Sequence, residues 1–162
     1  MNLGTTAVAT VTLTFCVSLV HGDSVFDPEH HSFDPLPERE PESPLVAVVD
    51  DDASFRKALG RLVALWGFRT WTFASAEEYL RVGIASDCLV LDLHLEGMSG
   101  LELQSKLNDA GSKIPIIFVT ATDDPVAERR ALDTGAVAYL EKPFEEERLL
   151  EVIQAVTGYR AC

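Results

Sequence analysis

Acidic, hydroxyl and ammonium groups stand directly after or at the end of apolar segments of this chain. Asp50 and Asp51 follow one such segment, Asp92 and Thr120 each end another, and Lys142 follows a last one. Clustered carboxylates repel one another and raise one another's pKa unless a cation joins them. Mg²⁺ prefers a few carboxylates with waters and a phosphate, and a lysine adds a fixed positive charge. If these groups meet, they predict phosphoryl transfer to Asp92 with formation of an aspartyl phosphate.

Each of these residues, taken alone, also fits an ordinary structural role. Asp51 or Asp52 suits the N-cap of a following helix, because an aspartate carboxylate accepts the free amides of a first turn. Thr120 fits a hydroxyl that satisfies a backbone group, and Lys142 fits a solvated surface charge. The functional interpretation therefore depends on all of them meeting at one place. Among the three successive acids, Asp52 is interpreted as the helix cap and not as a ligand.

From Leu45 onward the chain alternates between strand-like and helix-like patterns. The predicted strands are 45–50, 69–73, 88–92, 115–120 and 137–141, and the predicted helices are 53–67, 75–83, 100–111, 125–136 and 145–156. This alternation implies a parallel sheet with right-handed crossovers and helices on both faces. Burial on both faces explains why several of these strands are almost wholly apolar. Ligands of such sheets bind outside the carboxyl ends of the strands, so the polar groups are predicted to meet there.

Residues 1–44 differ in composition from the rest of the chain. Residues 5–20 are apolar and threonine-rich, and the residues after them hold five of the eight prolines and most of the acids of this segment, which is typical of a linker or a disordered region. An export signal, a membrane anchor and an extension without a folded role are the three interpretations. The apolar stretch lacks preceding positive residues and is short for a membrane span. We favour the extension and expect a folded domain over residues 45–162, located in the cytoplasm.

The overall composition argues against several classes of function. A formal charge of −13 disfavours direct nucleic-acid binding, which needs clustered lysine and arginine. Cys16, Cys88 and Cys162 are odd in number and far apart, so neither a disulfide framework nor a zinc site is expected. Cys88 stands inside an apolar run and is interpreted as a core residue. Neither GxxxxGK nor GxGxxG follows a predicted strand, which argues against the common nucleotide-binding loops.

Four segments, in order and at matching spacing, carry a resemblance to a known family: VAVVDDDASFRKAL, LVLDLHLEGMSGLELQ, PIIFVTATDD and DTGAVAYLEKPF. Over residues 45–158 the chain resembles the receiver domain of bacterial two-component response regulators, and within that family receivers of the FixJ type. The resemblance implies an α/β fold with a doubly wound, five-stranded parallel sheet, the (βα)5 flavodoxin-like receiver fold. It also implies a phosphorelay function.

The resemblance assigns roles to the polar residues. Asp92 matches the phosphoacceptor. Asp50 and Asp51 match the acidic pair that holds Mg²⁺ together with Asp92, and the backbone carbonyl of His94 matches a further metal contact; Mn²⁺ is an alternative ion. Lys142 matches a lysine that stabilises the bound phosphoryl group.

Further matches describe a switch beside this site. Thr120 matches a hydroxyl that hydrogen-bonds the phosphoryl group, Tyr139 matches an aromatic that turns inward in response, and Pro143 matches a cis-proline. His94 and Thr122 stand two residues past the acceptor and two past the switch threonine. We hypothesise that the side chains of His94 and Thr122 tune the lifetime of the phosphoryl group.

The resemblance also implies partners. A histidine kinase or a histidine phosphotransfer protein would donate the phosphoryl group. The signal would leave through the face of helix 125–136, strand 137–141 and helix 145–156, which includes Arg129 and Arg130. No segment of an output-domain type follows the last predicted helix, so a complete chain would act through a downstream protein; a phosphorylation-dependent homodimer is left open.

The expected protein is a stoichiometric phosphoryl acceptor and not a turnover enzyme. One alternative is a pseudo-receiver that binds partners without phosphorylation, which would require an incomplete site. Another is a hydrolase of the haloacid-dehalogenase type, whose second acid would stand at the position of His94. Glu96 departs from the family, which often carries proline there, and it adds negative charge near the site.

Overall fold

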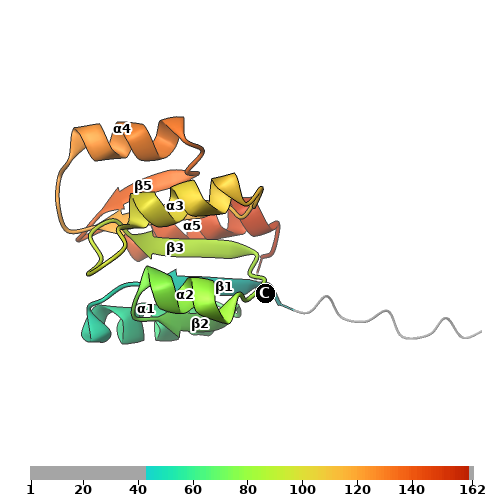
Figure 1. Cartoon of the computed structure of the whole chain (residues 1–162). Helices are drawn as coiled ribbons and strands as arrows, with labels where there is room; N and C mark the ends of the chain where they lie inside the picture. Colours follow the sequence, from blue (N-terminus) through green and yellow to red (C-terminus); the bar gives the residue numbers. More distant parts are fainter. Residues whose placement is uncertain (1–42, 161–162) are drawn as a thin grey trace, which may run out of the picture. The chain divides into compact units, whose positions relative to one another are not determined.

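The computed structural model describes residues 43–160, and within them five strands alternate with five helices (Figure 1). The strands are β1 (Leu45–Val49), β2 (Arg69–Phe73), β3 (Cys88–Asp92), β4 (Ile116–Thr120) and β5 (Ala138–Glu141). The helices are α1 (Ala53–Leu65), α2 (Ala76–Val82), α3 (Gly100–Asp109), α4 (Pro125–Asp133) and α5 (Glu146–Thr157). The predicted order and approximate bounds of all ten elements are confirmed.

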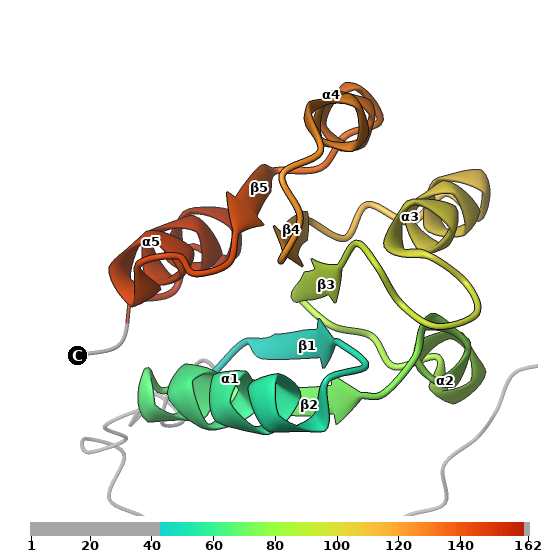
Figure 2. The same cartoon turned by 90° about the vertical axis from the view of Figure 1, so that its left-hand side faces the viewer.

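The strands form one parallel sheet in the order β2-β1-β3-β4-β5. Figure 2 shows α1 and α5 on one face of this sheet and α2, α3 and α4 on the other, so the predicted doubly wound fold is confirmed. The order of strands reverses between β1 and β3. Ligands of open α/β sheets bind at such a switch point, beyond the carboxyl ends of the strands.

The core consists of two apolar layers, one on each face of the sheet. Every residue of β1, β3 and β4 is buried, which accounts for the apolar runs of the sequence because parallel strands are covered on both sides. Cys88 is 0% exposed, as expected of a core residue. The edge strand β2 is largely exposed apart from Phe73. The ends of the buried strands β1, β3 and β4 are therefore held in place more firmly than the end of the edge strand β2.

Side-chain caps fix where the helices begin. Asp52 accepts hydrogen bonds from the amides of Ser54 (2.8 Å) and Phe55 (3.1 Å), which confirms its interpretation as an N-cap. Ser99 and Glu102 form a capping box at the start of α3, an arrangement that satisfies two free backbone donors at once. These caps start α1 and α3 close behind the strands that carry the acids.

The interpretations of residues 1–44 fall almost entirely outside the described part of the chain. Within residues 43–160, no helix combines the length and apolar character that crossing a membrane requires.

Candidate functional site

The carboxyl edge of the sheet gathers the polar residues that the sequence singled out. Val49 of β1 pairs with Leu91 of β3. Asp50 and Asp92, the residues that follow these two, are therefore neighbours at the switch point. These neighbours come from sequence positions far apart, and the parallel register of the two strands is what brings them together.

The next two strands add a hydroxyl and an amine to the same edge. Thr120 ends β4 and is fully buried. Lys142 follows β5, and its amide donates a 2.6 Å hydrogen bond to the carbonyl of Thr120. The peptide bond between Lys142 and Pro143 is cis.

Three carboxylates form the acidic part of this site. Asp50, Asp51 and Asp92 each offer an oxygen, and these oxygens lie within 4.8 Å of one another. Asp50 and Asp92 are buried, whereas Asp51 is exposed. Burial raises the pKa of Asp50, and the Lys142 ammonium opposes this effect. Oxygen ligands at this spacing, with one side open to solvent, suit Mg²⁺, which retains several waters when bound.

Lys142 joins two of these acids. Its Nζ donates to Asp50 Oδ2 at 2.7 Å and lies 3.5 Å from Asp92 Oδ2. The lysine side chain is 16% exposed, and those of Asp50 and Asp92 are 0% and 11% exposed. In this sparsely hydrated setting the ammonium offsets the charge of two carboxylates that would otherwise be buried without a partner.

The hydroxyl of Thr120 has two neighbours on the loops above the sheet. The amide of Thr122 donates to Thr120 Oγ1 at 3.3 Å, and the His94 ring places Nδ1 3.2 Å from the same oxygen. The amide of His94 also donates to Asp92 Oδ1 at 3.3 Å. The sequence placed His94 and Thr122 beside the site, but it did not indicate that the imidazole contacts the threonine.

The loop between β3 and α3 is held at two points. The amide of Glu96 donates to Asp51 Oδ2 at 3.2 Å, and the amide of Met98 donates to Glu77 Oε1 at 2.8 Å. The Glu96 side chain is exposed. The contact from Glu77, at the start of α2, was missed because no spacing in the sequence relates the two segments.

Gly100 is required where α3 approaches the end of β3. A Cβ at this position would lie 2.3 Å from the backbone oxygen of Asp92 and 2.9 Å from Cε1 of Phe118. Both distances are too short for real atoms, so α3 can begin here only without a side chain. The glycine lets the helix start directly against the acid-bearing strand.

Tyr139 lies apart from the polar cluster, on β5. Its ring packs against Phe118 with centroids 6.3 Å apart, and its buried hydroxyl has no hydrogen-bond partner within residues 43–160. Burial, aided by nearby acids such as Asp124 and Glu128, raises the pKa of Tyr139. An unpaired buried hydroxyl is costly. Because the Tyr139 hydroxyl has no partner among the described residues, no polar contact ties this side chain to one position.

Two residues of α1 that no sequence motif singled out, Phe55 and Arg56, also reach the site. Arg56 Nη1 donates to the backbone carbonyl of Asp50 at 2.5 Å, and the ring of Phe55 lies under the Lys142 ammonium, 3.8 Å from Nζ to the ring centroid. Their only sequence signal is their place in the first turn after the Asp52 cap.

Comparisons with known proteins agree with this fold. The sequence profile of the response regulator receiver domain matches residues 46–154, and the chain belongs to this family. The predicted resemblance to response regulator receivers is thereby confirmed.

Several relatives are whole regulators of greater length. Nodulation protein W of Bradyrhizobium diazoefficiens is 41% identical over 115 residues, which cover 70% of this chain and 51% of that protein. The response regulator protein TmoT of Ectopseudomonas mendocina is 41% identical over 112 residues, covering 68% and 51%. The chain thus spans about half the length of these curated relatives.

Solved receiver structures match over nearly their full length. The crystal structure of FixJ-N superposes with a TM-score of 0.67 at 33% identity, covering 74% of this chain and 98% of that one. A response regulator receiver protein from Burkholderia phymatum gives a TM-score of 0.65 at 40% identity, with the same coverage.

Proposed function

We propose that this protein is a phospho-accepting module of a two-component phosphorelay and that Asp92 is the phosphoacceptor. The observation that carries the proposal is the position of Lys142, whose Nζ lies between Asp50 and Asp92 at 2.7 and 3.5 Å. A second anion beside a buried carboxylate is tolerable only where positive charge is already in place. Family membership supports the same function.

The proposed reaction transfers one phosphoryl group without redox change. A carboxylate oxygen of Asp92 attacks phosphorus, an acyl phosphate bond forms, and the bond from phosphorus to the donor breaks with its electron pair left on the donor. When the donor is a phosphohistidine, the departing imidazole nitrogen takes up a proton. Lys142 stabilises the charge of the phosphoryl oxygens, and the Thr120 hydroxyl donates a hydrogen bond to one of them.

Asp50, Asp51 and Asp92 would hold the metal ion, with the backbone carbonyl of His94 as a further ligand. Mg²⁺ is the expected ion and Mn²⁺ a substitute, because both prefer oxygen ligands. When bound, such an ion neutralises charge on the phosphoryl oxygens. The proposal that these residues bind a divalent ion is supported by their three carboxylate oxygens, which lie within 4.8 Å of one another.

The proposed signal starts at Thr120. Phosphorylation adds about −1.5 to −2 charges at the site, and the hydroxyl of Thr120 moves toward the new group. Tyr139, whose hydroxyl has no partner among the described residues, turns toward the space that is left. A local event of this kind acts by biasing a two-state element, here the face of α4, β5 and α5 that carries Arg129 and Arg130.

His94 and Thr122 are proposed to set the lifetime of the phosphoryl group. The His94 ring and the backbone amide of Thr122 contact the Thr120 hydroxyl in the resting protein. Side chains at these two positions would control how water reaches the acceptor.

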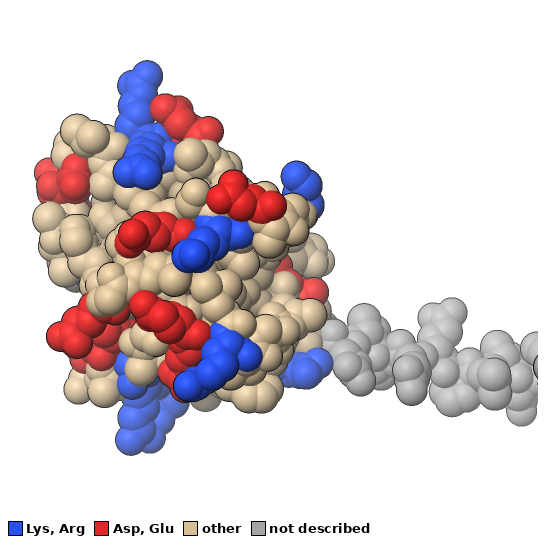
Figure 3. Space-filling view, in the orientation of Figure 1, with Lys and Arg blue, Asp and Glu red and all other residues tan. Residues whose placement is uncertain are grey.

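The proposed donor is a histidine kinase or a histidine phosphotransfer protein in the cytoplasm, and the receiving partner is a protein that binds the α4-β5-α5 face. A homodimer formed on phosphorylation is one form of this output. Figure 3, seen from the side of α2, α3 and α4 with α5 behind the sheet, shows acidic and basic side chains interspersed on that surface. Several relatives are named transcriptional regulatory proteins, among them TdiR of Thauera aromatica; direct nucleic-acid binding is not proposed for these 162 residues.

Incubation with acetyl phosphate and Mg²⁺ tests the proposal, with intact-protein mass and donor consumption followed together. We expect one phosphoryl group per protein, lost in Asp92→Asn and on removal of metal by EDTA. Donor consumption that continues far beyond the rate of acyl phosphate decay would indicate a turnover hydrolase. An unlabelled wild-type protein would indicate a pseudo-receiver.

A further inference from the structure

The ammonium of Lys142 rests on the face of an aromatic ring. Its Nζ lies 3.8 Å from the centroid of Phe55, well within the roughly 6 Å at which a cation is attracted to the negative face of a ring. The same nitrogen contacts Asp50 and Asp92. Two acids and one ring therefore define where this charge sits.

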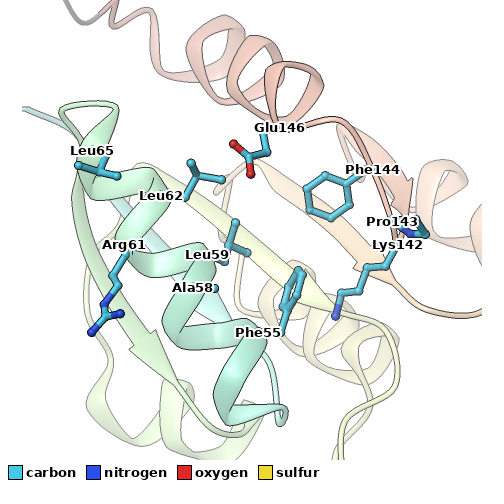
Figure 4. Close-up of a pocket in the computed structure, with 10 residues that line it drawn as sticks. All are labelled: Phe55, Ala58, Leu59, Arg61, Leu62, Leu65, Lys142, Pro143, Phe144 and Glu146. Atoms are coloured by element: carbon cyan, nitrogen blue, oxygen red, sulfur yellow. The ribbon is translucent and has the colours of Figure 1, made fainter.

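The Phe55 ring is itself held firmly. Phe55 belongs to the first turn of α1, where its amide donates to the Asp52 cap at 3.1 Å. Its ring packs edge to face on Phe144, with centroids 6.3 Å apart and planes at 86°. Figure 4 shows Phe55 next to the end of the Lys142 side chain, with Phe144 beside Phe55; both rings line the same cavity.

We propose that Phe55 is a positioning residue that holds the Lys142 ammonium in place for the phosphoryl group; this inference rests on the proposed function. Lysine is flexible, and its four-carbon stem loses rotamer entropy when the ammonium is fixed in one place. Without the ring, only Asp50 and Asp92 would position the Lys142 nitrogen, and Asp50 at 2.7 Å is the tighter partner.

The ring acts on Lys142 differently from the acids. It is not a hydrogen-bond acceptor that must be given up when the phosphoryl oxygens arrive, and its attraction has no single preferred bond direction. Lys142 can therefore transfer a hydrogen bond from Asp92 to a phosphoryl oxygen while it stays over Phe55. An aliphatic residue at position 55 would fill the same space without attracting the charge.

Fluorination of the ring separates attraction from packing. Successive fluorine atoms on Phe55, introduced as mono-, di- and trifluorophenylalanine, weaken the negative face of the ring while changing its shape little. We expect the rate of Asp92 phosphorylation by acetyl phosphate at saturating Mg²⁺ to fall stepwise, by about three- to tenfold over the series. Phe55→Trp should retain the rate, and Phe55→Leu should lower it as far as trifluorination does.

Phe68 provides the matched control. It belongs to the same apolar layer as Phe55, but its ring packs on Tyr159, with centroids 5.3 Å apart, so the same fluorinated series at position 68 should leave the rate within twofold of the unmodified protein. Equal rates across the Phe55 series, or equal declines at both positions, would overturn the proposal. A wild-type protein that is not labelled at all would instead refute the proposed function.

A second readout is independent of phosphorylation. The ring current of Phe55 should shift the NMR signals of the Lys142 ε-methylene upfield in the resting protein, and Phe55→Leu should remove this shift. Lys142 signals at ordinary positions in the wild-type protein would place the ammonium away from the ring and would overturn the inference even if Asp92 is phosphorylated.

Discussion

Replacement of Lys142 by methionine tests how charge is balanced at the site. The substitution keeps much of the length of the side chain and removes the ammonium that contacts Asp50 and Asp92. At an effective dielectric constant of about 20, Coulomb's law gives the two contacts gross attractions of about 6 and 5 kcal/mol at 2.7 and 3.5 Å. These values are gross because the charges also lose hydration on burial.

The net effect of breaking a buried pair by removing one partner is about 3–5 kcal/mol. We therefore expect Lys142→Met to lower the free energy of unfolding in EDTA by about this amount, measured by urea denaturation. Lys113 lies on the surface, so Lys113→Met should change stability by no more than about 0.5 kcal/mol. Comparing the two variants separates the effect of losing the buried ammonium from the effect of losing any lysine.

The same substitution should strengthen metal binding. The Lys142 ammonium and a divalent ion repel each other at the same carboxylates. Removing the ammonium should therefore tighten Mg²⁺ binding by about threefold or more, which corresponds to a gain of about 0.7 kcal/mol in binding free energy. Titration calorimetry measures this change, and Mg²⁺ should recover part of the lost stability. An unfolding free energy equal to that of the wild-type protein in EDTA, or weaker Mg²⁺ binding, would refute the reasoning.

Three further predictions concern individual residues of the site. Gly100→Ala should lower stability by about 1–3 kcal/mol or more in urea denaturation, because its Cβ would lie 2.3 Å from the Asp92 backbone oxygen; an unchanged midpoint would show that α3 shifts freely. Because burial raises the pKa of Asp50, metal-free wild-type protein should lose stability relative to Asp50→Asn as the pH rises through this raised pKa, and a constant difference would contradict the assignment. His94→Ala should speed the decay of the Asp92 phosphoryl group, since the ring that covers the Thr120 hydroxyl is removed; unchanged decay rates would exclude a role of His94 in the lifetime.

The sequence was sufficient to predict the elements and the edge where the polar residues meet. Apolar runs that end in Asp92 or Thr120 can be recognised without coordinates, and parallel strands direct all such ends to one side. The proximity of Asp50 to Asp92 follows from the adjacency and register of β1 and β3. It does not depend on the conformation of any single side chain.

Contacts that depend on rotamers and on packing between helices could not be predicted in this way. The position of the Phe55 ring depends on how α1 packs beside the segment of Phe144. The approach of His94 to Thr120 depends on how the imidazole is turned. Sequence spacing places such residues near the site, but it does not indicate which of their atoms touch it.

The most direct test of the phosphoacceptor assignment is to locate the phosphoryl group in the chain. Protein treated with acetyl phosphate and Mg²⁺ is reduced with borohydride, which converts an aspartyl phosphate to homoserine, and the peptides are sequenced by mass spectrometry. We expect homoserine at position 92 alone, and none when EDTA replaces Mg²⁺. Conversion at Asp50, Asp51 or another acid, with Asp92 intact, would contradict it.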